Sequence, residues 1–532
     1  LQSFEGPYCE ALDAIRPVAA LSAEAPPRAR VLGTVPLARG ELLRMSVEMP
    51  DYQSQLYVSY FMKSGEVAHL VPSRTEPARA RVALGEPAPG FPGWEVDEPF
   101  GTDLVVIFAS ERPIFPQRRP VVFTHAVLHT VADGIVLDGT LWWDEGVIRG
   151  VLPAGTAPNL PPGTSPVVID LQGRSVYPGF VSPFTTLGLE ELGAVRQTVD
   201  LDEVGELTAE ALAMTAVNPD SVALPVARSN GVLTAGVFPR GGLIAGRAAV
   251  IRLDGWTNQD LAVQADAGPV LQWPMRNHQP DLRRRGPRAE ASGDDPAAAV
   301  QKARDRIDAA FTAARAWQRA RAADPRVPHD VRHQALVPAL EGQVPVFLVA
   351  DELEQIESAV RWAVGTGLKP VVVGGRDALL CAPLLRRLDV PVVVGAVHRL
   401  PRRDDEAYSE PFELPALLAK AGVRFCLASG GDFSQERNLP YQAATAIAFG
   451  LDPARGLAAI TQDAATILGV GDRLGSLRVG KEATLFVSDG DPLALTTRIE
   501  LAFVQGRQID LRNKHTELAK KYRERYRQLQ GR

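Results

Sequence analysis

Cysteine is scarce in this chain, and so are long apolar runs and an excess of basic charge. Only three cysteines occur among the 532 residues, Cys9, Cys381 and Cys426. This excludes a disulfide framework and a clustered cysteine zinc site. No apolar segment reaches the ~18 residues that a membrane-spanning helix needs. The formal net charge of −6 argues against a general nucleic-acid binder.

The chain has the composition of an ordinary folded protein. It is 45% hydrophobic and 23% charged, which is close to the average of globular domains. At ~100–200 residues per domain, its length predicts two to four domains. The first residue is Leu1 rather than Met. Removal of a secretion signal is one explanation, which predicts a periplasmic or other extracytoplasmic location, and the choice of an expressed segment is another.

Residues 1–118 have the pattern of a separate all-β module. Runs rich in Val, Tyr and Phe are separated by Pro- and Gly-rich turns, which is typical of a small β-sandwich, and a short helix is expected over residues 4–18. The segments LYVSYFMKSGEVAHLVP (56–72) and PFGTDLVVIFASERPIF (99–115) resemble a bacterial β-sandwich domain of unknown function. That resemblance implies binding rather than chemistry.

Two distant stretches then carry a second resemblance. They are GRSVYPGFVSPFTTLGL (173–189) and GDRLGSLRVGKEATLFVSDGDPL (471–493), and together they resemble the amidohydrolase superfamily, imidazolonepropionase-like members above all. The resemblance implies a β-sandwich split between residues 119–177 and 471–512. It implies a metal-dependent TIM-like barrel over residues 178–470 between the two parts, and a basic helix over residues 513–532 follows them.

The barrel is also predicted by the residues themselves. Eight short apolar runs alternate with helical stretches, which is typical of buried parallel strands and predicts an α/β fold with a (β/α)8 barrel. The runs are 176–182, 232–238, 248–253, 269–272, 344–349, 369–373, 391–395 and 423–428. No helix is apparent between the third and fourth runs. A long amphipathic helix is expected over Pro296–Ala323, after a basic linker over residues 276–295.

The family's metal ligands are what the barrel sequence lacks. The superfamily pattern resembles P-G-F-x-D-x-H-x-H after the first strand, and this chain has Phe184 and Thr186 at the two histidine positions. The resemblance places Val349 and Gly374 at later histidine positions, and Gly430 near the catalytic aspartate position. Zn²⁺ needs three or four N, O or S donors, which these residues do not supply. We therefore predict a pseudoenzyme with no metal, no other cofactor and no catalytic residue.

Polar residues at or after the strand ends form a candidate ligand pocket. They are Thr186, Arg240, Asp351, Glu352, Arg376, Asp377, His398 and Asp432. The carboxyl ends of barrel strands meet at one rim, where active sites of this fold lie. The alternative interpretation of each residue is a salt bridge in a loop.

The last 22 residues are strongly basic. Residues 511–532 contain eight basic and two acidic side chains, and an apolar stripe runs along the predicted helix. The stripe consists of Leu511, His515, Leu518, Tyr522, Tyr526 and Leu529. We favour docking of this stripe on the sandwich or barrel over contact with a membrane or an acidic partner.

These observations favour a structural or binding subunit of a larger assembly. Other protein subunits are the expected partners, a homo-oligomer is also compatible, and nucleic acid is not expected. Two alternatives stay open: a metal-dependent hydrolase of non-peptide C–N bonds with a rebuilt site, and a small-molecule-binding protein that uses the emptied barrel pocket. Metal content distinguishes the first alternative from the subunit, and ligand-induced thermal shifts distinguish the second.

Overall fold

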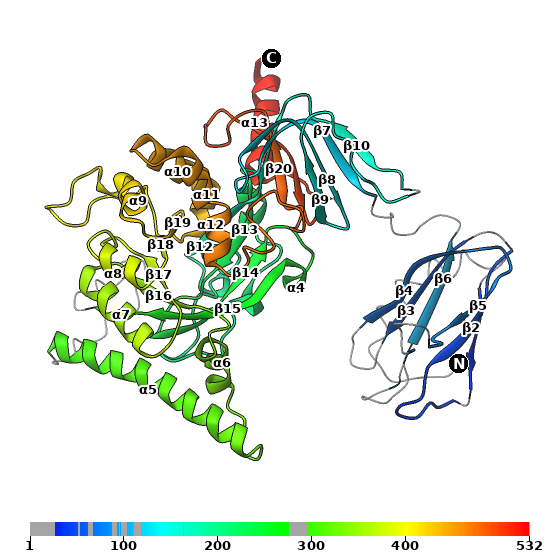
Figure 1. Ribbon diagram of the computed structural model, residues 1–532, viewed down its shortest axis with the longest axis horizontal. Helices are drawn as coiled ribbons and strands as arrows, with labels where there is room; N and C mark the ends of the chain where they lie inside the picture. The colour runs from blue at the N-terminus through cyan, green and yellow to red at the C-terminus, as the bar shows by residue number, and fades with distance from the viewer. Residues whose placement is uncertain are drawn as a thin grey trace. The chain divides into compact units, whose positions relative to one another are not determined.

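The computed structural model describes residues 27–33, 35–51, 54–61, 67–87, 93–94, 96, 104–110, 119–162, 164–275 and 295–530. The chain divides into two compact units, residues 1–118 and 119–532, whose elements are labelled in Figure 1. The helix expected over residues 4–18, and residues 276–294 of the expected linker, lie outside the described residues.

The first unit contains two three-stranded antiparallel sheets. Met45 and Val47 of one sheet share a buried core with Leu56 and Val58 of the other, which confirms the predicted all-β module. The sheet orders are β1-β2-β5 and β4-β3-β6. The strands are β1 (Arg28–Leu32), β2 (Arg44–Glu48), β3 (Ser54–Phe61), β4 (Val67–Glu76), β5 (Arg81–Leu84) and β6 (Leu104–Ser110).

In the second unit, strands from two distant stretches of sequence make one eight-stranded sheet. The strands are β7 (Val121–His129), β8 (Ile135–Asp144), β9 (Val147–Leu152), β10 (Val167–Asp170), β11 (Ser175–Pro178), β20 (Leu485–Ser488), β21 (Ile499–Val504) and β22 (Arg507–Gln508). The two stretches meet where β11 pairs with β20. The rings of Phe123, Trp143 and Phe503 pack edge to face with centroids 4.8 to 5.5 Å apart. This confirms the predicted split of the domain.

The barrel is an eight-stranded sheet in sequence order, β12 to β19. Its strands are β12 (Phe180–Thr185), β13 (Val232–Val237), β14 (Ile244–Arg252), β15 (Ala262–Gln272), β16 (Val346–Ala350), β17 (Pro370–Gly374), β18 (Val392–Val394) and β19 (Phe425–Leu427). Side chains alternate between two cores: Val371 and Val373 of β17 join one buried cluster, and Val372 joins the other. The outermost strands β12 and β19 contact each other and nearly close the barrel (Figure 1).

Two details of the predicted barrel are wrong. First, β14 runs antiparallel to both β13 and β15, so the strands are not all parallel. The six residues 238–243 between β13 and β14 are too few for a crossover, which needs a dozen or more. Second, the first predicted run divides into β11 and β12 at Gly179, whose N–H donates to the carbonyl of Thr484.

Helices cover the barrel unevenly. The second half has regular connections, with α7 (Leu353–Gly365), α8 (Ala382–Arg387) and α9 (Glu410–Ala421) between successive strands. The long predicted helix is confirmed as α5 (Pro296–Ala323), which begins after an Asp295 cap and buries Ile307 and Phe311. The remaining elements are η1 (Arg196–Thr198), α2 (Ala213–Ala216), α3 (Ala223–Arg228), α4 (Asn258–Leu261), α6 (Val331–Leu340), η2 (Phe433–Asn438), α10 (Leu439–Ala448), α11 (Pro453–Ala459), α12 (Gln462–Ile467) and α13 (Lys514–Gln530).

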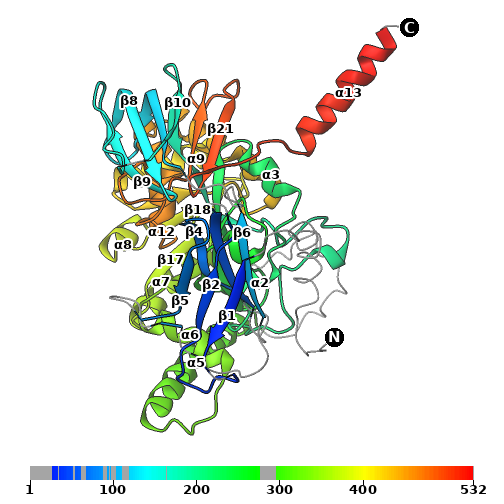
Figure 2. The same ribbon diagram turned by 90° about the vertical axis from the view of Figure 1, so that its right-hand side faces the viewer.

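The last helix, α13, is the predicted basic helix. Leu511 of the predicted stripe precedes it and packs against the barrel core, but the stripe residues within the helix do not dock on the barrel or the split sheet. Leu518, Tyr522, Tyr526 and Leu529 are 47%, 48%, 57% and 53% exposed. Figure 2 shows α13 projecting away from the rest of the second unit. In the part of the chain that the structure describes, no helix is long and apolar enough to cross a bilayer.

Candidate functional site

The rim formed by β12 and β13 is closed by an aromatic ring. Phe184 packs against the interior barrel core, and its ring meets that of Phe238 edge to face at a centroid distance of 5.1 Å. The guanidinium of Arg240, which follows β13, lies 5.9 Å from the Phe184 ring centroid. A side chain at Gly431, after β19, would overlap the Phe184 ring. Phe184 therefore occupies the space between the ends of β12, β13 and β19.

Two of the predicted pocket residues converge on the backbone next to this ring. The hydroxyl of Thr186 donates to the carbonyl of Gly431 at 3.5 Å, and the guanidinium of Arg240 donates to the same oxygen. Asp432 follows directly and accepts from the N–H of Ser434 at 2.9 Å, which caps η2. These contacts fix the loop after β19 on the ends of β12 and β13.

A second group of predicted residues follows β16 and β17 and is held by ion pairs. The Asp351 carboxylate lies 3.5 Å from the guanidinium of Arg376, which is only 7% exposed. The buried Asp377 accepts two hydrogen bonds, of 2.9 and 3.0 Å, from Arg403, and these bonds raise the pKa of Arg403. Asp377 also accepts from the N–H of Leu353 at the start of α7. Charge-assisted and two-bond pairs of this kind fix the geometry of the loops that carry them.

The other two predicted residues, Glu352 and His398, form separate hydrogen bonds in their loops. Glu352 directly precedes α7, and its N–H donates to the side chain of Gln355 at 3.3 Å. The Nε2 of His398 lies 2.7 Å from the Thr445 hydroxyl, and desolvation lowers the pKa of His398. His398 is therefore a neutral, hydrogen-bonded side chain at pH 7. The eight predicted residues thus divide between the β12–β13–β19 end, the β16–β17 end and isolated loop contacts.

The residues at the expected metal-ligand positions lie in or directly after barrel strands. Phe184 lies in β12, Val349 lies in β16, and Gly374 ends β17, where a Cβ would overlap the Asp351 carboxylate. Gly430 follows β19 with a φ of +105°, a conformation that favours glycine. Among the described residues, no group of three His, Cys, Asp or Glu side chains could hold a metal ion.

One buried acidic residue, Glu436, was not predicted from the sequence. Glu436 of η2 is 0% exposed, and among the described residues no group lies in good hydrogen-bond geometry to either carboxylate oxygen. Burial raises the pKa of Glu436 to about 7, although the nearby hydroxyls of Ser182, Thr185 and Ser429 lower it in part. These hydroxyls belong to β12 and to the residues after β19, so Glu436 lies at the join between the two ends of the barrel sheet. Nothing in its polar sequence context, SQERN, signals burial.

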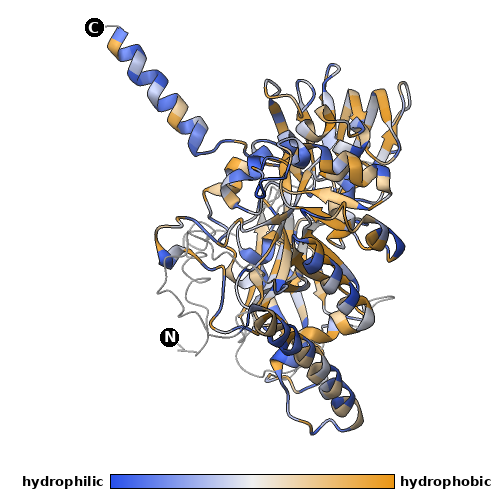
Figure 3. Cartoon of the chain, turned by 90° about the vertical axis from the view of Figure 1, so that its left-hand side faces the viewer, coloured by the Kyte–Doolittle hydropathy of each residue, from blue (hydrophilic) through white to orange (hydrophobic). Residues whose placement is uncertain are grey.

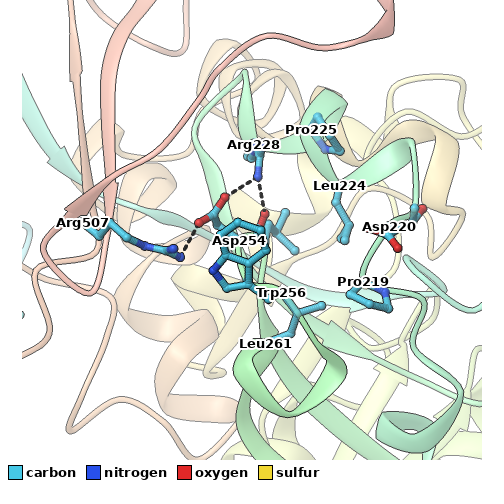
Figure 4. A pocket seen from close by; sticks show the side chains of 12 residues that line it. Pro219, Asp220, Leu224, Pro225, Arg228, Asp254, Trp256, Leu261 and Arg507 are labelled. Atoms are coloured by element: carbon cyan, nitrogen blue, oxygen red, sulfur yellow. Dashed lines mark hydrogen bonds and ion pairs between the residues drawn. The ribbon is translucent and has the colours of Figure 1, made fainter. Parts of the chain in front are cut away.

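The cavity in Figure 4 lies elsewhere, at the amino end of β13. It has a volume of 370 Å³ and is lined by α3, the loop after β14 and Arg507 of β22. Asp254 pairs there with both Arg228, at 2.6 Å, and Arg507. The N–H of Leu253 donates to Leu233 in β13, which places this cavity opposite the end that carries Arg240. It contains none of the predicted pocket residues.

Comparison with known proteins agrees with this geometry. The amidohydrolase family model matches residues 385–516. No curated protein matches the chain. An amidohydrolase from Thermotoga maritima MSB8 superposes with a TM-score of 0.62 at 22% identity, over 74% of this chain and 100% of that one. An adenosine deaminase from Xanthomonas campestris has a TM-score of 0.41 at 17% identity, over 78% of this chain and 100% of that one.

The family match covers the last part of the barrel and the second part of the split sheet. The superposition on the Thermotoga protein shows the fold. By these two findings, residues 385–516 match the amidohydrolase family, and the unit of residues 119–532 has the fold of an amidohydrolase.

Proposed function

We propose that this chain is a non-catalytic member of the amidohydrolase superfamily, used as a structural or binding subunit of a larger protein assembly. The observation that carries the proposal is Phe184. The resemblance aligns it with a metal-binding histidine, and its ring packs edge to face on Phe238. A phenyl ring has no lone pair for a metal, so this position contributes packing and no chemistry.

The other rim residues support the same interpretation. Val349 and Gly374 offer no donor atoms at the positions where the resemblance predicts further ligands. The carboxylates of Asp351 and Asp377, after β16 and β17, are paired with Arg376 and Arg403, and a metal ion would have to displace a guanidinium from each. A hydrolytic metal site needs three or four donors to lower the pKa of bound water toward ~7. The residues present do not fit such a site, so no hydrolytic step follows from them.

Metal content and turnover test this proposal together. We expect the dialysed protein to carry well under one zinc, manganese or iron per chain, and to hydrolyse none of a panel of cyclic and linear amides. The double variant Phe184→His, Thr186→His should remain inactive in the presence of zinc, because Val349 and Gly374 still supply no ligand. About one metal per chain at the barrel rim, with hydrolysis of an amide, would contradict the proposal.

A hydrolase with a rebuilt site is the second candidate, and Glu436 is the observation that favours it. A carboxyl whose pKa is raised to about 7 has the value expected of a general acid or base near neutral pH. If the panel reveals turnover, Glu436→Gln should abolish it and Glu203→Gln, at an exposed position, should not. Turnover that survives Glu436→Gln would exclude this role.

A further inference from the structure

Helix α13 presents an apolar stripe on an otherwise charged surface. None of its residues is buried, and Leu518, Tyr522, Tyr526 and Leu529 are each about half exposed. At ~100° per residue, these four side chains fall within about a quarter of the helix circumference. In Figure 3 the helix projects from the second unit and is largely hydrophilic, interrupted by hydrophobic segments. Its whole length is therefore presented outward as one amphipathic surface.

The charges are ordered around this stripe. With the same helical spacing, Lys521 and Arg525 lie along one edge of the stripe and Arg523 lies along the other, while Lys520 and Arg527 lie on the opposite face. Glu517 and Glu524, the only acidic residues between Lys514 and Gln530, both lie on the opposite face. Glu524 is paired there with Arg527 at 2.7 Å. The face centred on the stripe is thus apolar in the middle and basic on both sides.

The helix also carries charge opposite to that of the rest of the chain. It contains six basic and two acidic side chains, a net charge of +4, while the whole chain has −6, so the other residues carry −10. A second copy of the helix is a poor partner for the stripe, because both edges would place arginine and lysine against arginine and lysine. A flat, uniformly negative surface matches the pattern, because both basic edges meet it at once and both glutamates point away.

We propose that α13 binds the surface of a bilayer that contains anionic phospholipids, lying parallel to it. Leucine and tyrosine side chains enter the interface between headgroups and acyl chains, where tyrosine is favoured. The flanking lysines and arginines stay at the level of the phosphates, as in other basic amphipathic helices. The contact of α13 with α3 fixes the root of the helix, so the barrel would remain on the water side.

Vesicle flotation with the full chain tests the proposal. We expect binding to vesicles of equal parts phosphatidylglycerol and phosphatidylcholine, little binding to pure phosphatidylcholine, and loss of binding as salt is raised. Lys521→Gln with Arg525→Gln should weaken binding roughly thirtyfold. Leu518→Ser with Leu529→Ser should weaken it at least about tenfold, since two buried apolar side chains are lost.

Glu517→Gln with Glu524→Gln is the matched control, because it changes two charges on the face that points away from the membrane. This variant should bind at least as well as the parent. All three variants should melt at the parent's temperature, because α13 buries no side chain. Absence of vesicle binding would overturn the proposal, and so would equal binding to both vesicle types. The proposal would also be overturned if the protein did not bind vesicles but associated with itself through α13 in a salt-sensitive way. In that case α13 would bind an acidic surface of another protein molecule.

Discussion

The hairpin half of the barrel, β12–β15, and the parallel half, β16–β19, close the same rim in different ways. At the hairpin half, Phe184 fills the rim with its ring and Arg240 covers it. At the parallel half, Asp377 and Arg403 form a two-bond ion pair over the strand ends. The first closure depends on shape and burial, and the second depends on charge. The two halves should therefore respond differently to mutation, pH and salt.

Glu436 lies where the two halves meet, and it should give the largest effect. Its pKa is about 7 in the folded protein and about 4.3 in an unfolded chain. Because the folded pKa is raised, the protein is most stable below the unfolded value and loses stability as pH rises to about 7. Glu436→Gln should remove this loss and stabilise the protein at pH 8 by roughly 4 kcal/mol. Denaturant melts between pH 4 and pH 8 measure it.

The exposed variant Glu203→Gln is the control for that series, and its melts should follow the parent at every pH. If Glu436→Gln keeps the parent's pH dependence, the carboxyl is ionised in the folded protein and the join between the halves contains a partner for it.

Phe184→Ala tests closure by shape in the hairpin half. Truncating a fully buried phenyl costs ~3–5 kcal/mol, and Phe184 is partly buried, so we expect a loss of about 2 kcal/mol at all pH values and salt concentrations. The matched control is Tyr408→Ala, because Tyr408 is 73% exposed and should lose much less. A Phe184→Ala melt equal to that of the parent would mean that the rim is open at this end.

Asp377→Asn tests closure by charge in the parallel half. It removes an ion pair whose carboxylate is 4% exposed and whose guanidinium is 42% exposed. Because Arg403 can be hydrated when it loses its partner, we expect a loss of about 1 kcal/mol. The variant Arg424→Gln breaks a similar two-bond pair with Asp389, exposed on both sides, and should cost less. If both variants lost the same free energy of unfolding, burial of Asp377 would add nothing to the stability that its ion pair contributes.

The sequence predicted the parallel half better than the hairpin half. Valine-rich runs separated by helical stretches identify β16 to β19, because buried parallel strands need apolar residues on both faces. The direction of β14 was also within reach, since only residues 239–247 separate the second predicted run from the third, and a crossover needs a dozen or more. The ion pair of Asp377 was not, because Arg403 lies in a long loop whose path depends on tertiary packing. Glu436 was missed for the same reason, since its neighbours in sequence are polar and its burial comes from β12.

The antiparallel strand has a consequence for how the barrel assembles. Strands β13 and β14 are joined by six residues, whereas 73 residues separate β15 from β16. The entropy lost on closing a loop grows with its length, and short-range pairs form faster than long-range ones. The contacts between β13 and β14 in the hairpin half therefore form with a smaller loss of loop-closure entropy than those between β15 and β16. The hairpin half can serve as a template on which the later strands add in order.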